Sequence, residues 1–160
     1  MNNPLRPDNF DSIIGQEEII NNLKISVKSA QKRGDTLQHC LFYGNAGLGK
    51  TTLARALANE LGIDIQVANG ASLSTNKDIL PYLMKLEEGS ILFIDEIHRV
   101  SKKVQEYLLT VIEDFRLDIV TPAGKDDCGK TISIDIPKFC LVGATTEMGD
   151  LVQPFLDRFK

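Results

Sequence analysis

Short apolar runs alternate along this chain with longer segments in which apolar residues recur every three or four positions. Three unbroken runs and one alternating segment predict strands at residues 40–43, 63–68, 91–94 and 139–144. The repeating spacings predict a helix with apolar positions from Ile19 to Ala30 that closes near Gly34, and helices at residues 51–61 and 80–87 and between Ser101 and Phe115. Unbroken apolar runs are typical of strands buried on both faces of a parallel sheet. The alternation of strands and helices therefore predicts an α/β fold with a parallel sheet.

Three residues predict where these helices begin and end. Gly62 ends the second helix, because glycine readily adopts the left-handed backbone that closes a helix. Ser101 precedes the fourth helix as its N-cap. Pro81 fits best within the first turn of a helix, which favours a start at Leu80 and disfavours an earlier start at Lys77.

A β-hairpin arm is predicted between the fourth helix and the last strand. Residues 117–120 and 131–136 alternate between apolar and polar side chains, and the turn-rich stretch 121–130 separates them. We therefore expect an arm over residues 117–136.

Composition narrows the class of protein. With 160 residues, of which 42% are apolar and 25% charged, the chain can form one globular domain. A formal net charge of −4 argues against a principal nucleic-acid surface, which needs clustered Lys and Arg. There is no long apolar segment and no signal pattern at Met1, so we expect a cytoplasmic protein. The cysteines Cys40, Cys128 and Cys140 lack zinc-binding spacing and are expected to be reduced.

Residues Gly44 to Thr51 have the P-loop pattern G-x-x-x-x-G-K-T between a predicted strand and a predicted helix. In such a loop, backbone N–H groups and the helix N-terminus bind phosphate oxygens. Lys50 is expected to reach the β- and γ-phosphates, and Thr51 to bind Mg²⁺ through its hydroxyl. The phosphate-binding residues predicted beside them are Gly44, Gly47, Leu48, Gly49 and Thr52. The pattern predicts binding of ATP with magnesium.

An acidic pair, Asp95 and Glu96, follows the apolar run 91–94. The carboxyl ends of parallel strands are where α/β proteins bind ligands. Asp95 is expected to hold the magnesium shell and Glu96 to polarise the attacking water as a general base. The pair therefore favours ATP hydrolysis over ATP binding alone.

Two further roles remain open in the sequence. A hydroxyl at Thr145 or Thr146 either orients the lytic water and senses the γ-phosphate or is an ordinary β-branched strand end. Arg158 follows the predicted last element and fits an arginine finger that stabilises charge on a neighbour's nucleotide. Spacing alone does not decide either role.

Several motifs in a fixed order resemble the RuvB family of AAA+ ATPases, the motors of Holliday-junction branch migration. The P-loop and the Asp-Glu pair identify only the AAA+ superfamily. The more specific motifs are Asp-Glu-Ile-His-Arg at 95–99, Glu-Asp-Phe at 113–115 and Gly-Ala-Thr-Thr at 143–146, together with Leu5-Arg6-Pro7, Ile14-Gly15-Gln16 and Asp157-Arg158-Phe159. The resemblance covers essentially all 160 residues. It implies a P-loop NTPase sheet of the AAA+ type, sandwiched by helices and carrying an inserted β-hairpin.

The resemblance also implies roles for individual residues. Thr146 would be sensor 1, and Arg158 would act in trans on the ATP of the next subunit in a hexameric ring. The residues implied to contact the nucleotide are Leu5, Arg6 and Ile14 around the base and Glu113, Asp114 and Phe115 from the adjacent subunit. The 117–136 hairpin would dock onto a RuvA-type junction-binding protein, unless it is an ordinary surface hairpin.

The same resemblance implies parts beyond this segment and leaves rivals to consider. The family's last sheet strand, helical lid and winged-helix domain, which binds the four-way junction, have no counterpart in residues 1–160.

Some residues depart from those usual in the family. They are Asn45-Ala46, Glu147 and Lys160, and the hairpin loop is also longer than is usual. A clamp-loader or initiator-type ATP switch, and a nucleotide-gated module with negligible hydrolysis, are the alternatives to a branch-migration ATPase in recombination and repair.

Overall fold

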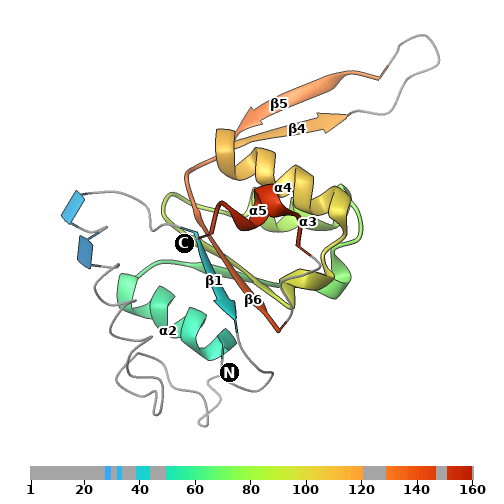
Figure 1. Cartoon of the computed structure of the whole chain (residues 1–160). Coiled ribbons are helices and arrows are strands. Elements are labelled where there is room, and N and C mark those ends of the chain that lie inside the picture. The colour runs from blue at the N-terminus through green and yellow to red at the C-terminus, as the bar shows by residue number, and fades with distance from the viewer. Residues whose placement is uncertain are drawn as a thin grey trace.

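The computed structural model shows a parallel sheet flanked by helices, with a two-stranded arm that extends from it (Figure 1). The structure describes residues 28–29, 32–33, 39–43, 50–120, 129–146 and 151–159. The first predicted helix lies largely outside these residues. So do the glycine loop at 44–49, the turn at 121–128 and the predicted base contacts Leu5, Arg6 and Ile14.

Four parallel strands form the central sheet in the order β1-β6-β3-β2. They are β1 (Cys40–Tyr43), β2 (Ile65–Asn69), β3 (Ile91–Asp95) and β6 (Cys140–Thr145). The helices are α2 (Lys50–Leu61), α3 (Asn76–Met84), α4 (Lys102–Asp114) and α5 (Gln153–Leu156), with short 3₁₀ turns at η2 (Gly70–Ser72) and η3 (Ile97–Arg99). The predicted parallel α/β sheet is therefore confirmed. No helix among the described residues is long and apolar enough to cross a membrane.

Alternate residues of the buried strands face two separate apolar cores. One core packs α2 against the sheet through Ala54, Ala56, Ala58, Ile91, Phe93, Cys140, Val142 and Ala144. The other packs α3, α4 and α5 against the opposite face, where Leu92, Ile94 and Leu141 point. Figure 1 shows α2 on one side of the sheet and α3, α4 and α5 on the other. Because successive side chains of a strand point to opposite faces, the sheet has one face covered by α2, the α2 face, and one covered by α3, α4 and α5, the α4 face.

The ends of α2 and α4 follow the predicted caps. Gly62 ends α2 with a φ of +65°, and the Ser101 hydroxyl accepts a hydrogen bond from Val104 N–H at 3.3 Å. Helix α4 stops at Asp114, one residue earlier than predicted, because Phe115 takes a left-handed conformation with φ 49°. The Phe115 ring instead packs edge-on against Phe139, with a centroid distance of 5.7 Å.

The predicted bounds of the third helix were wrong. Helix α3 begins at Asn76 rather than Leu80, with Pro81 inside it. The Asp78 carboxylate accepts hydrogen bonds from the N–H groups of Ser74 (3.0 Å) and Thr75 (2.9 Å), which caps the earlier start. These bonds lower the pKa of Asp78. The carbonyl that Pro81 leaves unbonded in a regular helix belongs to the exposed Lys77, where water can bind it.

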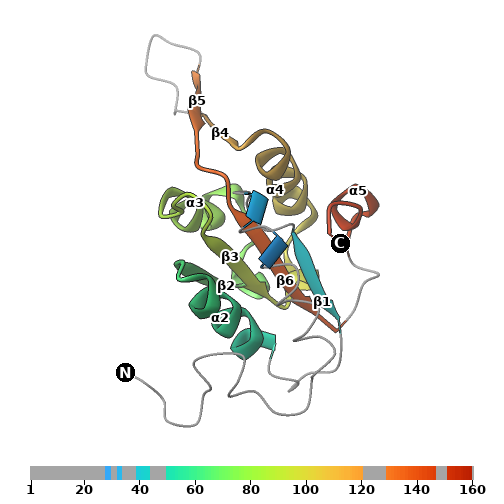
Figure 2. The same ribbon diagram turned by 90° about the vertical axis from the view of Figure 1, so that its left-hand side faces the viewer.

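The predicted hairpin is present as a separate antiparallel pair of strands. β4 (Arg116–Val120) pairs with β5 (Thr131–Asp135), and Ile119 lies opposite Ile132. Figure 2 shows the two strands extending away from the body of the molecule. This register places Leu117, Ile119, Ile132 and Ile134 on one apolar face of the arm.

One side chain extends the edge of the parallel sheet. His39 precedes β1, and its Nδ1 accepts a hydrogen bond from Leu141 N–H of β6 at 2.9 Å. Burial lowers the pKa of His39 to about 4. The imidazole is therefore neutral at physiological pH and takes the place of a backbone acceptor in the sheet.

Candidate nucleotide-hydrolysis site

The carboxyl ends of three neighbouring strands meet at one edge of the sheet. Asp95 ends β3 and lies in register with Asn69, the last residue of β2, while Thr145 ends β6. In β3, Asp95 follows the same alternation as Ile91 and Phe93, which pack against α2. Asp95 therefore lies on the face of the sheet that α2 covers.

The N-terminus of α2 supplies the second part of the site. The helix begins at Lys50, and the side chains of Thr51 and Thr52 in its first turn are half-buried. A helix N-terminus attracts anions through its free N–H groups and its dipole. The structure thus brings the predicted phosphate-binding end of α2 and the predicted metal-binding Asp95 to the same face.

The turn after β3 holds Glu96 in a left-handed conformation with φ 49° and ψ 48°. Glu96 N–H donates a hydrogen bond to Asp95 Oδ1 at 2.9 Å. A Cβ on Gly70 would lie 2.2 Å from the Glu96 carbonyl oxygen, and one on Gly143 would lie 2.7 Å from Ile97 Cδ1. The glycine that follows β2 and the glycine within β6 therefore let the turn of Glu96 and Ile97 pack closely between them.

The Glu96 side chain remains accessible. Its Oε2 lies 3.3 Å from Arg99 Nη1, and the side chains are 44% and 56% exposed, respectively. An ion pair this exposed contributes little to stability and separates easily. The Glu96 carboxylate is consequently accessible for its predicted role as general base, with Arg99 beside it.

Thr145 and Thr146 differ sharply in their surroundings. Thr145 is buried, and its hydroxyl lies 2.9 Å from His98 Nδ1 of η3. Thr146 follows the strand and is exposed. Of the two hydroxyls, the one at Thr146 is therefore the more accessible to a nucleotide, while Thr145 and His98 tie β6 to the turn that carries Glu96.

Arg158 lies on the other side of the sheet from α2. It follows α5, which packs on the α4 face through the buried Phe155, and its guanidinium forms an ion pair with Glu113 near the end of α4. Glu113 and Asp114 are exposed, whereas Phe115 is half-buried against Phe139. The structure thus brings Arg158 and Glu113 together but does not join them to Asp95 and α2.

The residues at the strand edge fit a magnesium ion that is held mainly by water and phosphate. Mg²⁺ in nucleotide sites takes only one or two protein oxygens. Thr51 and Asp95 are the predicted pair, and both belong to the α2 face of the sheet. Within the described part of the chain, no cluster of three or more His, Cys, Asp or Glu side chains could hold a metal without such help.

Sequence reasoning missed three residues of this site. Asn69 became apparent only through its register with Asp95, because β2 and β3 are separated by a whole helix in the chain. His98 and Arg99 lie within the recognised 95–99 motif, but the motif alone gave them no contacts.

The sheet topology and the site at its carboxyl edge define the fold of a P-loop ATPase of the AAA+ type. The family profile described as "Holliday junction DNA helicase RuvB P-loop domain" matches residues 5–160. The chain belongs to this RuvB family.

Known relatives agree with this family. The chain is 50% identical to the Holliday junction branch migration complex subunit RuvB of Campylobacter fetus subsp. fetus, covering 97% of this chain and 45% of that protein. The corresponding subunit of a Nitratiruptor species is 48% identical over 97% of the chain and 46% of that protein. A solved Thermotoga maritima RuvB, titled a Holliday junction branch migration motor, aligns with a TM-score of 0.79 and 42% identity over 96% of this chain and 46% of that one. This chain thus spans a little under half the length of these relatives.

Proposed function

We propose that this chain is the ATPase core of a ring-shaped DNA motor that drives branch migration of Holliday junctions in recombination and repair. The observation that carries the proposal is that Asp95, which Glu96 follows directly, lies on the face of the sheet that α2 covers. This arrangement suits hydrolysis, because the phosphate-binding helix end and the general base converge at one strand edge.

Each residue of the shared face has a proposed task. Lys50 and the loop before it bind the β- and γ-phosphates, and Thr52 supports the phosphates nearer the base. Thr51 and Asp95 hold Mg²⁺, which supplies charge neutralisation on the phosphate oxygens when bound. Glu96 accepts a proton from the attacking water, and Thr146 orients that water or senses the γ-phosphate. Leu5, Arg6 and Ile14 are proposed to contact the base.

We infer that the site is completed by a second copy of the chain. Arg158 and the segment 113–115 lie on the α4 side of the sheet, away from the α2 face that carries Asp95. A guanidinium in this position cannot act on its own subunit's nucleotide through the α2 face, but it can face the nucleotide of a neighbour. A hexameric ring with shared active sites satisfies this geometry, as the family membership suggests.

The proposed partners are a RuvA-type protein and four-way junction DNA. The exposed apolar face of the β4–β5 hairpin suits docking onto another protein. The net charge of −4 argues that the main DNA contacts lie outside residues 1–160. Such a role goes with the cytoplasmic location expected from the sequence.

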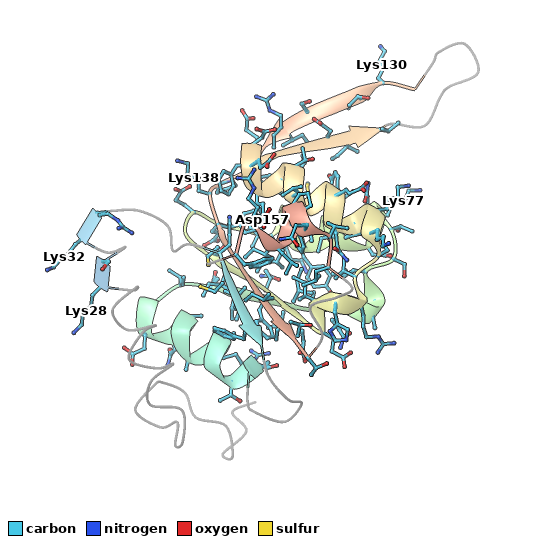
Figure 3. The ribbon with its side chains drawn as sticks, viewed as in Figure 1. Lys28, Lys32, Lys77, Lys130, Lys138 and Asp157 are labelled. Atoms are coloured by element: carbon cyan, nitrogen blue, oxygen red, sulfur yellow. The ribbon has the colours of Figure 1, made fainter. Side chains whose placement is uncertain are left out.

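The Lys50→Ala variant tests the proposal. At the protein's full natural length, the variant is expected to lose ATP turnover and junction migration by roughly a hundredfold or more, because the γ-phosphate loses its cation. Lys138→Ala is the matched control, since Lys138 is exposed and its side chain points away from the body (Figure 3). Branch migration by Lys50→Ala at the wild-type rate, measured with a RuvA-type partner on a synthetic junction, would overturn the mechanism.

A further inference from the structure

A buried amide on α4 joins the active-site turn to the segment that carries Arg158. Gln105 is fully buried, one of only three buried polar side chains among the residues that the structure describes. A buried polar group requires hydrogen-bond partners, and two of those of Gln105 are Val100, five residues away in the chain, and Val152, 47 residues away. The Gln105 side chain therefore joins two parts of the chain that are far apart in sequence.

On one side, the Gln105 amide holds the turn that follows the general base. Gln105 Nε2 donates a hydrogen bond to the Val100 carbonyl oxygen at 3.0 Å. Val100 N–H in turn donates to the Ile97 carbonyl at 3.1 Å, which closes η3 immediately after Glu96. Because Glu96 and η3 form one tight turn, the amide is connected to the backbone of the general base through only a few bonds.

On the other side, the same amide holds the start of α5. Gln105 Oε1 accepts a hydrogen bond from Val152 N–H at 2.8 Å, across 47 residues of sequence. Phe155, one turn later, is fully buried, and Arg158 N–H donates to the Phe155 carbonyl at 3.2 Å. The position of Arg158 is thus set by a short helical segment that Gln105 anchors at its beginning.

We propose that Gln105 is a positioning residue. It fixes the segment from Val152 to Arg158 relative to the Glu96 turn of the same subunit. Arg158 is thereby presented to the neighbouring subunit's nucleotide in a position set by the donor subunit's own active-site turn. The inference rests on the proposed function, because it assumes that Arg158 acts in trans. Its main consequence is that a defect at Gln105 reduces hydrolysis at the neighbour's site rather than at its own.

The chemistry of the position suits an amide. One side chain must donate to the Val100 carbonyl and accept from Val152 N–H at the same time, and the amide of Gln does so from two separate atoms without carrying a charge. Gln105→Met keeps the length and the burial but removes both bonds. Gln105→Glu keeps an acceptor for Val152 N–H, and in its protonated form it also donates to the Val100 carbonyl.

Single variants at full natural length give the first measurement. Gln105→Met is expected to lower kcat for ATP about tenfold while KM and ADP affinity stay within about twofold, because the phosphate-binding loop is untouched. Gln105→Glu is expected to retain most of the wild-type kcat, since the anchor to Val152 remains. Thermal unfolding identifies any variant that fails to fold, and Gln105→Asn, one methylene shorter, then replaces Gln105→Met.

Mixed rings give the decisive measurement. Gln105→Met is mixed with an equal amount of Glu96→Gln. The Glu96→Gln subunit cannot hydrolyse ATP, but its segment that carries Arg158 is intact. In random rings, half of the Gln105→Met sites receive Arg158 from a Glu96→Gln neighbour. A tenfold defect that acts in trans then predicts a rise of about fivefold in turnover per Gln105→Met subunit. A defect that acts in cis predicts no rise.

A parallel mixture separates this inference from the proposed function. Arg158→Ala mixed with Glu96→Gln recovers turnover if the active site is shared between subunits. Recovery there without recovery for Gln105→Met rejects the role of Gln105 and leaves the shared site intact. Recovery in neither mixture rejects the shared site, and the inference about Gln105 falls with it. Wild-type turnover of Gln105→Met alone also overturns the inference.

Discussion

Two strands of this molecule have the same length and the same last two residues, yet they are placed in opposite surroundings. β3 reads Ile-Leu-Phe-Ile-Asp and its four apolar residues are fully buried in the parallel sheet. β5 reads Thr-Ile-Ser-Ile-Asp, and all five of its residues are exposed on the hairpin. The aspartates differ accordingly: Asp95 is half-buried at the strand edge, whereas Asp135 pairs with Arg116 at 3.2 Å on the surface.

The contrast shows which apolar residues the chain buries within itself and which it leaves exposed. The buried strands make their contacts within the chain and hold the catalytic edge in place. The apolar face of the hairpin is buried at its base, where Leu117 is fully covered, and becomes exposed along β5, where Ile132 is 48% exposed. A two-stranded ribbon is marginally stable alone, so an apolar face left open on it is suited to a partner. Changes at the sheet edge are therefore expected to affect catalysis and stability, and changes on the arm to affect association.

The largest expected effect is at the sheet edge, at Gly70. A Cβ added there would lie 2.2 Å from the Glu96 carbonyl oxygen, a backbone atom, so the turn must shift. A general base displaced by about 1 Å costs roughly a hundredfold in rate, so Gly70→Ala is expected to lower ATP turnover by that order. Steady-state hydrolysis measures it, and binding of a fluorescent ADP analogue should stay near wild type.

Ala71→Ser serves as the control for Gly70→Ala. Ala71 is exposed in the same 3₁₀ turn, and its side chain takes no part in the contact with Glu96. Wild-type turnover is expected for this variant. If Gly70→Ala also hydrolyses ATP at the wild-type rate, the close approach of Gly70 does not position Glu96.

The next effect sharpens the description of the sheet edge through pH. His39 has a pKa of about 4 in the fold, whereas a histidine in the unfolded chain titrates near 6.5. Between these values the unfolded chain binds a proton that the folded protein does not, so stability rises with pH and is lost as pH falls below about 6.5. Unfolding free energy should therefore decrease at pH 5 by about 2 kcal/mol from this group.

The His39→Gln variant isolates that contribution. Its amide oxygen can accept the bond from Leu141 N–H but cannot take up a proton in this range. Chemical denaturation at pH 7.5 and pH 5 should show a smaller loss of stability for the variant than for the wild type. An identical pH dependence in both proteins would mean that His39 is not kept neutral by the fold.

The hydrophobic pattern was sufficient to predict the sheet, because buried parallel strands leave unbroken apolar runs. It also predicted the hairpin and the caps Gly62 and Ser101 from local residue types. It failed at the start of α3. Pro81 favoured a start at Leu80 in the sequence, but in the structure the capping by Asp78 prevails and the helix begins at Asn76. Where this helix starts depends on whether the cap or the proline has the larger effect on the free energy, and the residue types alone do not give these two contributions.

The contacts that complete the site depend on tertiary structure. Arg158 and Glu113 are 45 residues apart, and both were expected to face a neighbour's nucleotide, but their ion pair with each other was not anticipated. Gln105 lies three residues before Leu108 and seven before Ile112, so helical spacing places it on the apolar side of α4, but the spacing does not give its hydrogen-bond partners. Its role depends on Val152 at the start of α5, which is 47 residues away in the chain and donates to the Gln105 side chain. Residue types predicted the chemistry of the site, but only the fold shows which residues are neighbours.

The smallest effect on stability, and the most direct test of the comparison, is on the hairpin. Ile132 and Ile134 are 48% and 37% exposed on its apolar face. Replacing both with serine is expected to change the unfolding free energy by only about 1 kcal/mol and to leave basal ATP turnover unchanged, because neither contacts the catalytic edge. Affinity for a RuvA-type partner should fall at least about tenfold, since exposed apolar side chains of a docking surface commonly carry its binding energy.

Ser133→Ala provides the matched control for that double substitution. Ser133 lies between the two isoleucines on the opposite face of β5, where its hydroxyl donates to Asp118 at 2.6 Å. Its removal should leave partner affinity within about twofold, because it does not alter the apolar face. If the isoleucine variant binds the partner as tightly as Ser133→Ala does, the apolar face is not the docking surface. If the isoleucine variant unfolds instead, Ile132 and Ile134 are needed for stability. The strands β3 and β5 then differ less in their contribution to stability than their exposure indicates.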